Sequence, residues 1–125
     1  LDYWKDVRIE EYKSKEAFFA AHEQDELYLF SARGRATHSE VHYQRDKDIY
    51  LVFGKESVGL EEELIKRFPS RTVRIPMLKG TRCLNLSNCA AIALYEVLRQ
   101  QEYQGFQKEG ELYFSTWEET DGKQD

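Results

Sequence analysis

The stretch Asp48-Ile-Tyr-Leu-Val-Phe-Gly-Lys-Glu-Ser-Val-Gly-Leu60 decides the fold that this sequence predicts. Its residues 49–53 form a continuous apolar run, which is typical of a parallel strand buried on both faces. Gly54 ends this run, and Gly59 precedes a segment whose apolar residues recur at helical spacing until Pro69. A buried strand followed directly by a helix is the repeating unit of an α/β protein.

The segments on either side extend this alternation of strands and helices. Strands are expected at 7–12, 26–31 and 72–75, and helices at 14–24 and 87–102. Ser14 is expected to cap the first of these helices, and Ser87 or Asn88 the second. Residues 35–47 are polar and predict turns, with a short extended piece at 41–43. The sequence therefore predicts an α/β fold with a mostly parallel sheet flanked by helices.

The last predicted helix carries more apolar residues than one buried face needs. Its expected core stripe is the helically spaced set Ala91, Leu94, Tyr95 and Leu98. Ile92 and Val97 add apolar side chains outside that stripe. Apolar surface of this kind usually marks a contact with a partner, so a homodimer is expected.

Length and composition are those of one compact domain. The chain has 125 residues, of which 41% are hydrophobic, so it can bury a core. Its longest apolar run is the seven residues 89–95, whereas a membrane-spanning helix needs about 20. The first residues lack the basic and apolar regions of a secretory signal, so a cytoplasmic protein is expected. Cys83 and Cys89 are interpreted as reduced thiols, since two cysteines do not make a zinc site.

Charge is distributed unevenly along the chain. The net charge is −5, yet residues 33–82 hold 11 Lys/Arg against 7 Asp/Glu, a local excess of +4. Such a basic middle can present one positive face to a phosphate backbone, although an ordinary solvated surface would show the same counts.

The sequence contains two local patterns that resemble ligand-binding motifs, a histidine pair and a glycine turn. His38 and His42 do not fit the zinc-binding H-E-x-x-H pattern, which favours a surface turn and no metal site. The turn between Gly54 and Gly59 matches neither the dinucleotide fingerprint nor the Walker loop, so its spacing favours a structural turn. The segment 75–88 is the most unusual, because a strand ends at Pro76, the following loop carries the cations Lys79 and Arg82, and N-capping does not account for the whole loop.

A family resemblance joins these segments. Leu51-Val-Phe-Gly-Lys-Glu-Ser-Val-Gly-Leu60, Arg74-Ile-Pro-Met77, Asn85-Leu-Ser-Asn88 and Tyr95-Glu96 resemble the second and third motifs of the SPOUT class of RNA methyltransferases. Within that class the similarity is closest to the small bacterial enzymes that methylate the 2′-OH of cytidine or uridine 34 in tRNA. The resemblance implies a C-terminal deep trefoil knot, which general priors against chain threading would never suggest. It also implies S-adenosylmethionine as cofactor, a homodimer, tRNA as partner and no metal.

The resemblance also assigns roles to individual positions. The implied cofactor-binding residues are Phe30, Gly54, Ile75 and Cys83; the implied catalytic residues are Glu56, Asn85 and Ser87; the implied RNA-binding residues are Arg33, Lys55, Lys79 and Arg82. The reaction implied is transfer of a methyl group to the ribose 2′-OH of the wobble nucleotide, position 34, of a tRNA.

The resemblance covers residues 1–106, which we interpret as a SPOUT methyltransferase domain lacking its N-terminal strand–helix unit and the arginine carried there. Residues 107–125 form an acidic C-terminal tail that the resemblance does not place. Because the chain begins at Leu1, a processed protein or a fragment is expected. Two alternatives remain: a 2′-O-methyltransferase for rRNA or another tRNA position, and a noncatalytic module that binds RNA or S-adenosylmethionine.

Overall fold

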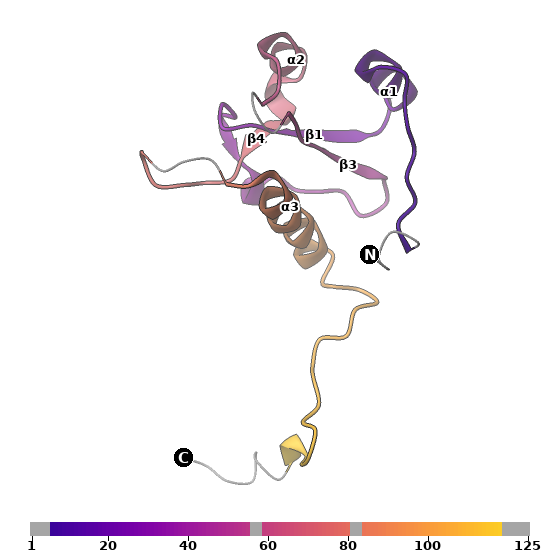
Figure 1. The fold of residues 1–125 in the computed structure, drawn as a ribbon, viewed down its shortest axis with the longest axis vertical. Helices are drawn as coiled ribbons and strands as arrows, with labels where there is room; N and C mark the ends of the chain where they lie inside the picture. Colours follow the sequence, from indigo (N-terminus) through magenta and orange to yellow (C-terminus); the bar gives the residue numbers. More distant parts are fainter. Residues whose placement is uncertain (1–5, 56–58, 81–83, 119–125) are drawn as a thin grey trace.

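The computed structural model describes residues 6–55, 59–80 and 84–118, and within them a four-stranded parallel sheet flanked by helices (Figure 1). Its elements in chain order are α1 (Lys15–Ala21), β1 (Glu26–Phe30), β2 (Ala36–Thr37), the 3-10 helix η2 (His38–Glu40), β3 (Ile49–Val52), α2 (Glu62–Arg67), the 3-10 helix η3 (Pro69–Arg71), β4 (Thr72–Arg74) and α3 (Leu86–Gln100). The strand order is β2-β4-β1-β3, and every pairing is parallel. The predicted α/β class is confirmed.

The core lies on both faces of the sheet because the side chains of β1 alternate between them. Leu27 and Leu29 pack with Phe19 of α1 and Leu64 of α2 on one face. Tyr28 and Phe30 face the opposite way and pack with Val73 of β4 and with Ala93 and Val97 of α3. Figure 1 accordingly shows α1 and α2 on one side of the sheet and α3 on the other. Each face is therefore covered, as a parallel sheet requires.

Helix starts agree only in part with the sequence prediction. Ser14 caps α1 as predicted, and its hydroxyl oxygen accepts from the Ala17 backbone N–H at 3.1 Å. The N-cap of α3 is Asn85, so the prediction of Ser87 or Asn88 was wrong. Asn85 accepts from both of these backbone N–H groups, which places them inside the first turn.

Two strand predictions were also wrong. Residues 7–12 form no strand, and Val7 and Ile9 stay 53% and 59% exposed because no strand or helix among the described residues covers them. The segment 35–47, predicted as turns, contributes the edge strand β2 and the buried Tyr43, while its piece 41–43 is not a strand. A strand of two residues depends on pairing with β4, which local sequence does not encode.

One crossing of the chain distinguishes this sheet. β2 follows β1 in the sequence, yet β4 lies between them, so residues 31–35 pass across the carboxyl end of β4. The Ser31 backbone N–H donates to the Val73 carbonyl at 2.9 Å. Gly34, within this crossing segment, lies so close to β4 that a Cβ there would be 2.5 Å from the Val73 carbonyl carbon. Only glycine fits without moving the backbone.

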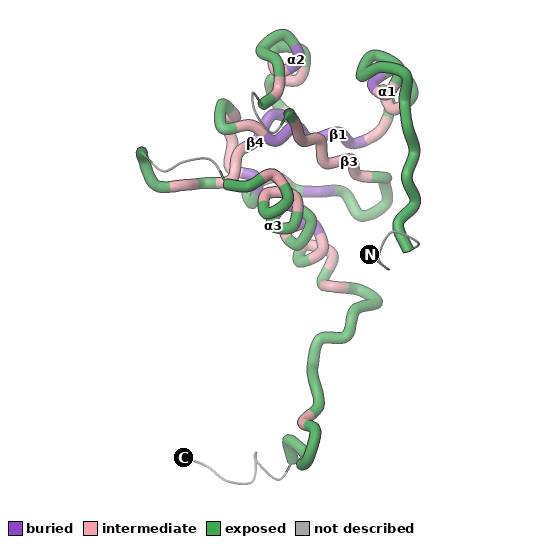
Figure 2. Tube along the Cα trace, in the orientation of Figure 1, coloured by how far each residue is buried: buried purple, intermediate pink, exposed green. Residues whose placement is uncertain are grey.

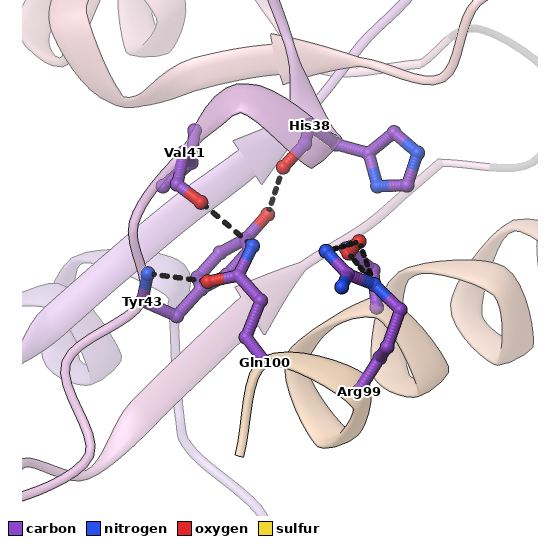
Figure 3. A network of polar contacts seen from close by, with 6 residues as sticks. His38, Val41, Tyr43, Arg99 and Gln100 are labelled. Atoms are coloured by element: carbon purple, nitrogen blue, oxygen red, sulfur yellow. Dashed lines mark hydrogen bonds and ion pairs between the residues drawn. The ribbon is translucent and has the colours of Figure 1, made fainter. Parts of the chain in front are cut away.

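α3 is held in place by the segment that follows β2 (Figure 3). The Gln100 side chain donates to the Val41 carbonyl at 2.8 Å and accepts from the Tyr43 backbone N–H at 3.1 Å. The Tyr43 hydroxyl donates to the His38 carbonyl at 2.8 Å. His38 is buried in this arrangement, so the surface turn predicted for it was wrong, although His42 is exposed. No described helix is long and apolar enough to cross a membrane.

Glu26 forms a buried ionic group at the opposite, amino end of the sheet. Its carboxylate accepts from the Tyr28 hydroxyl at 2.7 Å and from Arg71 at 3.1 Å, with Lys47 3.9 Å away. The hydrogen bond from Tyr28 and the two cations hold the pKa of Glu26 below its ordinary value of 4.5.

We expect Glu26→Gln to lower the free energy of unfolding by about 2 kcal/mol at pH 7, because the buried carboxylate that accepts from Tyr28 and pairs with Arg71 and Lys47 is lost. The contribution of a carboxyl whose pKa is lowered is full above the unfolded-state pKa and is lost as pH falls through the folded-state pKa. Urea unfolding of both proteins should therefore differ at pH 7 and converge as the pH falls well below 4.5. Glu23→Gln, at an exposed position, is the control and should change little; a constant difference at all pH values would contradict the account.

Candidate functional site

The carboxyl ends of β1, β3 and β4 meet at one edge of the sheet, where open α/β sheets bind their ligands. The Phe30 and Phe53 rings stack there with centroids 4.8 Å apart and planes 22° apart. Together with Ile75, Leu86 and Cys89 they line a cavity of about 90 Å³. The remaining lining residues are Ser31, Ala32, Met77 and Leu84. The predicted positions Phe30 and Ile75 thus share one apolar cavity.

A larger cavity of about 420 Å³ lies next to it, on the face covered by α1 and α2, and Phe53 lines both. Gly54 and Lys55 line this second cavity, so the structure separates them from Phe30 and Ile75 by the Phe53 ring. Gly54 has a φ of 117°, which disfavours any other residue, but a Cβ there would meet nothing within 4 Å. Glycine is therefore required here by backbone conformation rather than by crowding.

The turn after Gly54 is closed by its own backbone. Lys55 N–H donates to the Gly59 carbonyl at 3.0 Å, and Gly59 N–H donates to the Lys55 carbonyl at 2.7 Å. These two hydrogen bonds hold Lys55 and Gly59 together and so fix the point from which the chain leads into α2. Glu56, predicted as a catalytic residue, lies outside the described residues, as do Arg82 and Cys83.

The start of α3 brings two predicted catalytic side chains together. The Ser87 hydroxyl donates to Asn85 Oδ1 at 2.5 Å, and that oxygen also accepts from the Ser87 backbone N–H at 2.8 Å. A hydroxyl has one proton and two lone pairs, so Ser87 Oγ is left with acceptor capacity only. Both side chains are exposed and lie close in sequence to Leu86, which lines the smaller cavity.

Cations surround this edge of the sheet. The predicted residues Arg33, Lys55 and Lys79 follow β1, β3 and β4, and all three are exposed. Arg33 is partly neutralised by Glu62 of α2, at 3.2 Å. Sequence reasoning missed Arg35 and Arg74, which lie beside the crossing of residues 31–35 over β4.

Several lining residues were also missed. Phe53 could have been found, because it is the last apolar residue before Gly54 in a predicted strand. Leu84, Leu86 and Cys89 come from the loop before α3 and its first turns, where the sequence gives no periodic signal. The steric role of Gly34 is seen only from the crossing over β4.

The buried face of α3 differs from the one predicted. Ala93 and Val97 pack on the sheet, whereas Ala91, Leu94 and Tyr95 of the expected core stripe are exposed. Val97 was expected to lie outside the core, and it is 5% exposed. The outward face of α3 instead presents Ile92, Leu94 and Tyr95, at 40%, 47% and 56% exposure. The expectation of apolar surface beyond one face is nevertheless confirmed.

This is an α/β protein with apolar cavities at the carboxyl ends of its parallel strands, the place where α/β proteins generally bind cofactors and nucleotides. The chain belongs to the SpoU rRNA Methylase family, whose profile matches residues 1–95.

Known proteins similar to this chain agree with that family. A Listeria monocytogenes protein is 43% identical over 104 residues, covering 82% of this chain and 62% of its own length. An Escherichia coli K12 protein named tRNA (cytidine(34)-2′-O)-methyltransferase is 36% identical and is covered over 66% of its length. This chain thus spans about three fifths of the length of the first of these relatives.

Solved structures give the same result. A structure described as giving insights into the 2-OH methylation of C/U34 on tRNA superposes with a TM-score of 0.74 and 41% identity, covering 82% of this chain and 62% of that one. An AdoMet-bound rRNA methyltransferase from Sinorhizobium meliloti has a TM-score of 0.59 and 27% identity, covering 67% of this chain and 32% of that one.

Proposed function

We propose that this protein takes part in S-adenosylmethionine-dependent methylation of the ribose 2′-OH at nucleotide 34 of tRNA, in the cytoplasm. The observation that carries the proposal is the placement of the Asn85–Ser87 pair beside an apolar cavity and exposed cations. The names of the E. coli relative and of the C/U34 structure support the same substrate.

The smaller cavity fits the apolar part of the proposed cofactor. Phe30, Phe53 and Ile75 offer flat and aliphatic surface for a purine ring, and the AdoMet-bound relative supports this cofactor. Drug-sized ligands occupy roughly 300–1,000 Å³, so the cavity holds a portion of such a molecule. The bound cofactor would supply an electrophilic methyl group. Gly54 and Cys83 are proposed to contact the cofactor through backbone atoms.

Ser87 is proposed to orient the ribose hydroxyl. Because the only proton of the Ser87 hydroxyl is donated to Asn85, Ser87 Oγ can accept a hydrogen bond from a 2′-OH. This hydrogen bond would orient the 2′-OH so that one of its lone pairs faces the methyl donor. Asn85 fixes this polarity, and Glu56 is proposed to hold the turn after Gly54. Transfer would form the O–CH3 bond, break the S–CH3 bond of the bound cofactor and release the hydroxyl proton, which passes through the hydrogen bond to Ser87 to solvent water. Alignment supplies most of the effect in this scheme.

Arg33, Lys55, Lys79 and Arg82 are proposed to contact the phosphates of the RNA, which positions it without reading its sequence. The exposure of the first three at one sheet edge supports this role.

We expect Lys55→Ala to weaken tRNA binding and to reduce the slope of log affinity against log salt by about one, since one cation no longer displaces a counterion. Fluorescence anisotropy at several salt concentrations measures this slope. Lys66→Ala, at an exposed position on α2, is the matched control and should leave the slope unchanged. Equal slopes for both variants and the unaltered protein would indicate an ordinary solvated surface.

A homodimer is proposed through the outward face of α3. Ile92 and Tyr95 are neighbours on this face at i, i+3 spacing, and Leu94 is exposed at its flank, so the apolar surface is more extensive than a single exposed residue.

We expect Tyr95→Glu to convert the dimer into a monomer, because each copy would bury a carboxylate in the two-fold contact. Light scattering at micromolar concentration reports the mass. Ile9→Glu alters a residue of similar exposure in the N-terminal segment, outside α3, and should leave the mass that of a dimer. A monomeric unaltered protein would contradict the proposal.

A trefoil knot is proposed for residues 26–100. Its support is the crossing of residues 31–35 over β4, combined with the hold of residues 38–43 on the end of α3. We also propose that residues 1–106 pair with a further N-terminal strand–helix unit. β3 forms an open edge of the described sheet, and the relatives are longer than this chain.

Methyl transfer tests the proposed function against its alternatives. The chain, extended by the N-terminal unit of a longer relative, is incubated with tritiated S-adenosylmethionine and either tRNA or rRNA. Label in tRNA at nucleotide 34 supports the proposal. Label in rRNA or elsewhere in tRNA favours the alternative of a 2′-O-methyltransferase for rRNA or another tRNA position. Cofactor binding by calorimetry without any transfer would favour a noncatalytic binding module.

A further inference from the structure

The segment after α3 leaves the body of the protein as an extended segment that is not part of the sheet (Figures 1 and 2). Glu102 and Tyr103 adopt left-handed backbone conformations, with φ of 61° and 52°, and thereby end the helix. Local backbone hydrogen bonds, including Phe106 N–H to the Tyr103 carbonyl at 2.9 Å, set the direction of departure. Among residues 107–118, all but Leu112 are exposed.

Residues 110–117 of this tail form a small loop that displays aromatic side chains. The Trp117 indole N–H donates to the Gly110 carbonyl at 2.9 Å and closes the loop. Tyr113 and Phe114 lie within it and are 96% and 102% exposed. Two neighbouring aromatic side chains in full contact with solvent form an apolar surface of the kind that partners bind.

The charge of the tail restricts that partner. Residues 107–125 contain two lysines and six acidic residues, a net charge of −4. Such a segment is repelled by RNA and by anionic lipid. It fits a surface that combines positive charge with exposed apolar side chains.

The chain itself carries a surface of that kind. Lys79 is exposed and follows Leu78, which is 84% exposed, in the loop after β4. Leu84, at 37% exposure, lies before α3, and Arg74 and Lys55 add positive charge at the same sheet edge. We call Leu78, Lys79 and Leu84 the docking strip. Aromatic and acidic residues on the tail match its leucines and lysine.

The geometry of α3 indicates which copy of the strip is used. α3 begins beside the docking strip and ends, after 15 residues or about 22 Å, at the origin of the tail. In a two-fold contact between antiparallel α3 helices, the end of one helix lies beside the start of the other. The tail of one copy thereby starts close to the docking strip of the second copy.

We propose that the tail loop of one copy docks on the docking strip of a second copy and competes there with RNA. The proposal rests on the dimer and RNA surface of the proposed function. Its consequence is a protein that lowers its own affinity for RNA unless a substrate displaces the tail.

Photo-crosslinking tests the docking directly. A benzophenone amino acid replaces Phe114 in the full chain, and isotopically light and heavy copies are mixed before irradiation. Cross-links between a light and a heavy peptide that map to residues 75–79 or 84–86 are expected. Cross-links confined to one chain, or to other surfaces, would overturn the commitment to a second copy.

RNA binding tests the competition. The double variant Tyr113→Ser, Phe114→Ser should bind tRNA about five- to tenfold more tightly at low salt, where the charge on the strip matters most. Phe106→Ser, which changes a half-exposed aromatic residue of the same tail outside the loop, is the control and should bind like the unaltered protein. Equal affinities for all three proteins would overturn the competition. A light–heavy cross-link with no tRNA binding by any variant would uphold the docking and refute the proposed function.

Discussion

Replacing Gly34 with alanine is expected to destabilise the protein by about 2–4 kcal/mol, or to prevent folding altogether. A Cβ at this position would lie 2.5 Å from the carbonyl carbon of Val73 and 2.7 Å from its oxygen. These are backbone atoms of β4, which is paired with β1 on one side and β2 on the other, so they cannot move without breaking a strand pairing. The clash can therefore be relieved only by distorting the strand pairing, and not by rotating a side chain.

Urea unfolding followed by circular dichroism measures the effect. Gly110→Ala is the matched control, because a Cβ there meets nothing within 4 Å and no left-handed φ is involved. Its unfolding midpoint should equal that of the unaltered protein. If Gly34→Ala also kept the original midpoint, the crossing of residues 31–35 over β4 would be wrong.

The second large effect is expected at Asn85. Asn85→Ala removes the oxygen that receives the Ser87 proton, so the hydroxyl of Ser87 is free to rotate and no longer presents a fixed acceptor. We expect methyl transfer by the extended chain to fall about 100-fold. The same change removes the N-cap of α3 and should cost only about 1 kcal/mol of stability.

Two further variants separate positioning from capping. Asn85→Asp retains an oxygen for the Ser87 hydroxyl and should recover both the stability and most of the activity. Ser87→Ala keeps the cap but lacks the acceptor, so it should be as inactive as Asn85→Ala while folding normally. Full activity of Ser87→Ala would remove Ser87 from the proposed reaction.

The parts of the fold that follow local signals were predictable. β1 and β3 lie in short, mainly apolar runs, and β4 lies in a short run with Val73 and Ile75 that Pro76 ends; such signals predict strands. The carboxyl ends of those strands carry Phe30, Gly54 and Ile75, and so the edge that holds the site followed from the same runs.

Long-range contacts decided the rest. The start of α3 is rich in alanine and other apolar residues on all sides, so periodicity alone could not tell that Ala93 and Val97 face the sheet. β2 exists because β4 offers it a pairing edge, and its two residues carry no strand signal. The steric role of Gly34 depends on a crossing between segments about 40 residues apart, which no local pattern encodes.

The central claim is transfer of a methyl group to one ribose hydroxyl. Tritiated methyl incorporation is measured with two tRNA transcripts that differ only at nucleotide 34, one with its 2′-OH and one 2′-deoxy. With the extended chain we predict label in the first transcript and none in the second. With residues 1–125 alone we predict a negligible rate. Equal labelling of both transcripts, or no labelling by an extended chain that binds S-adenosylmethionine and tRNA, would contradict it.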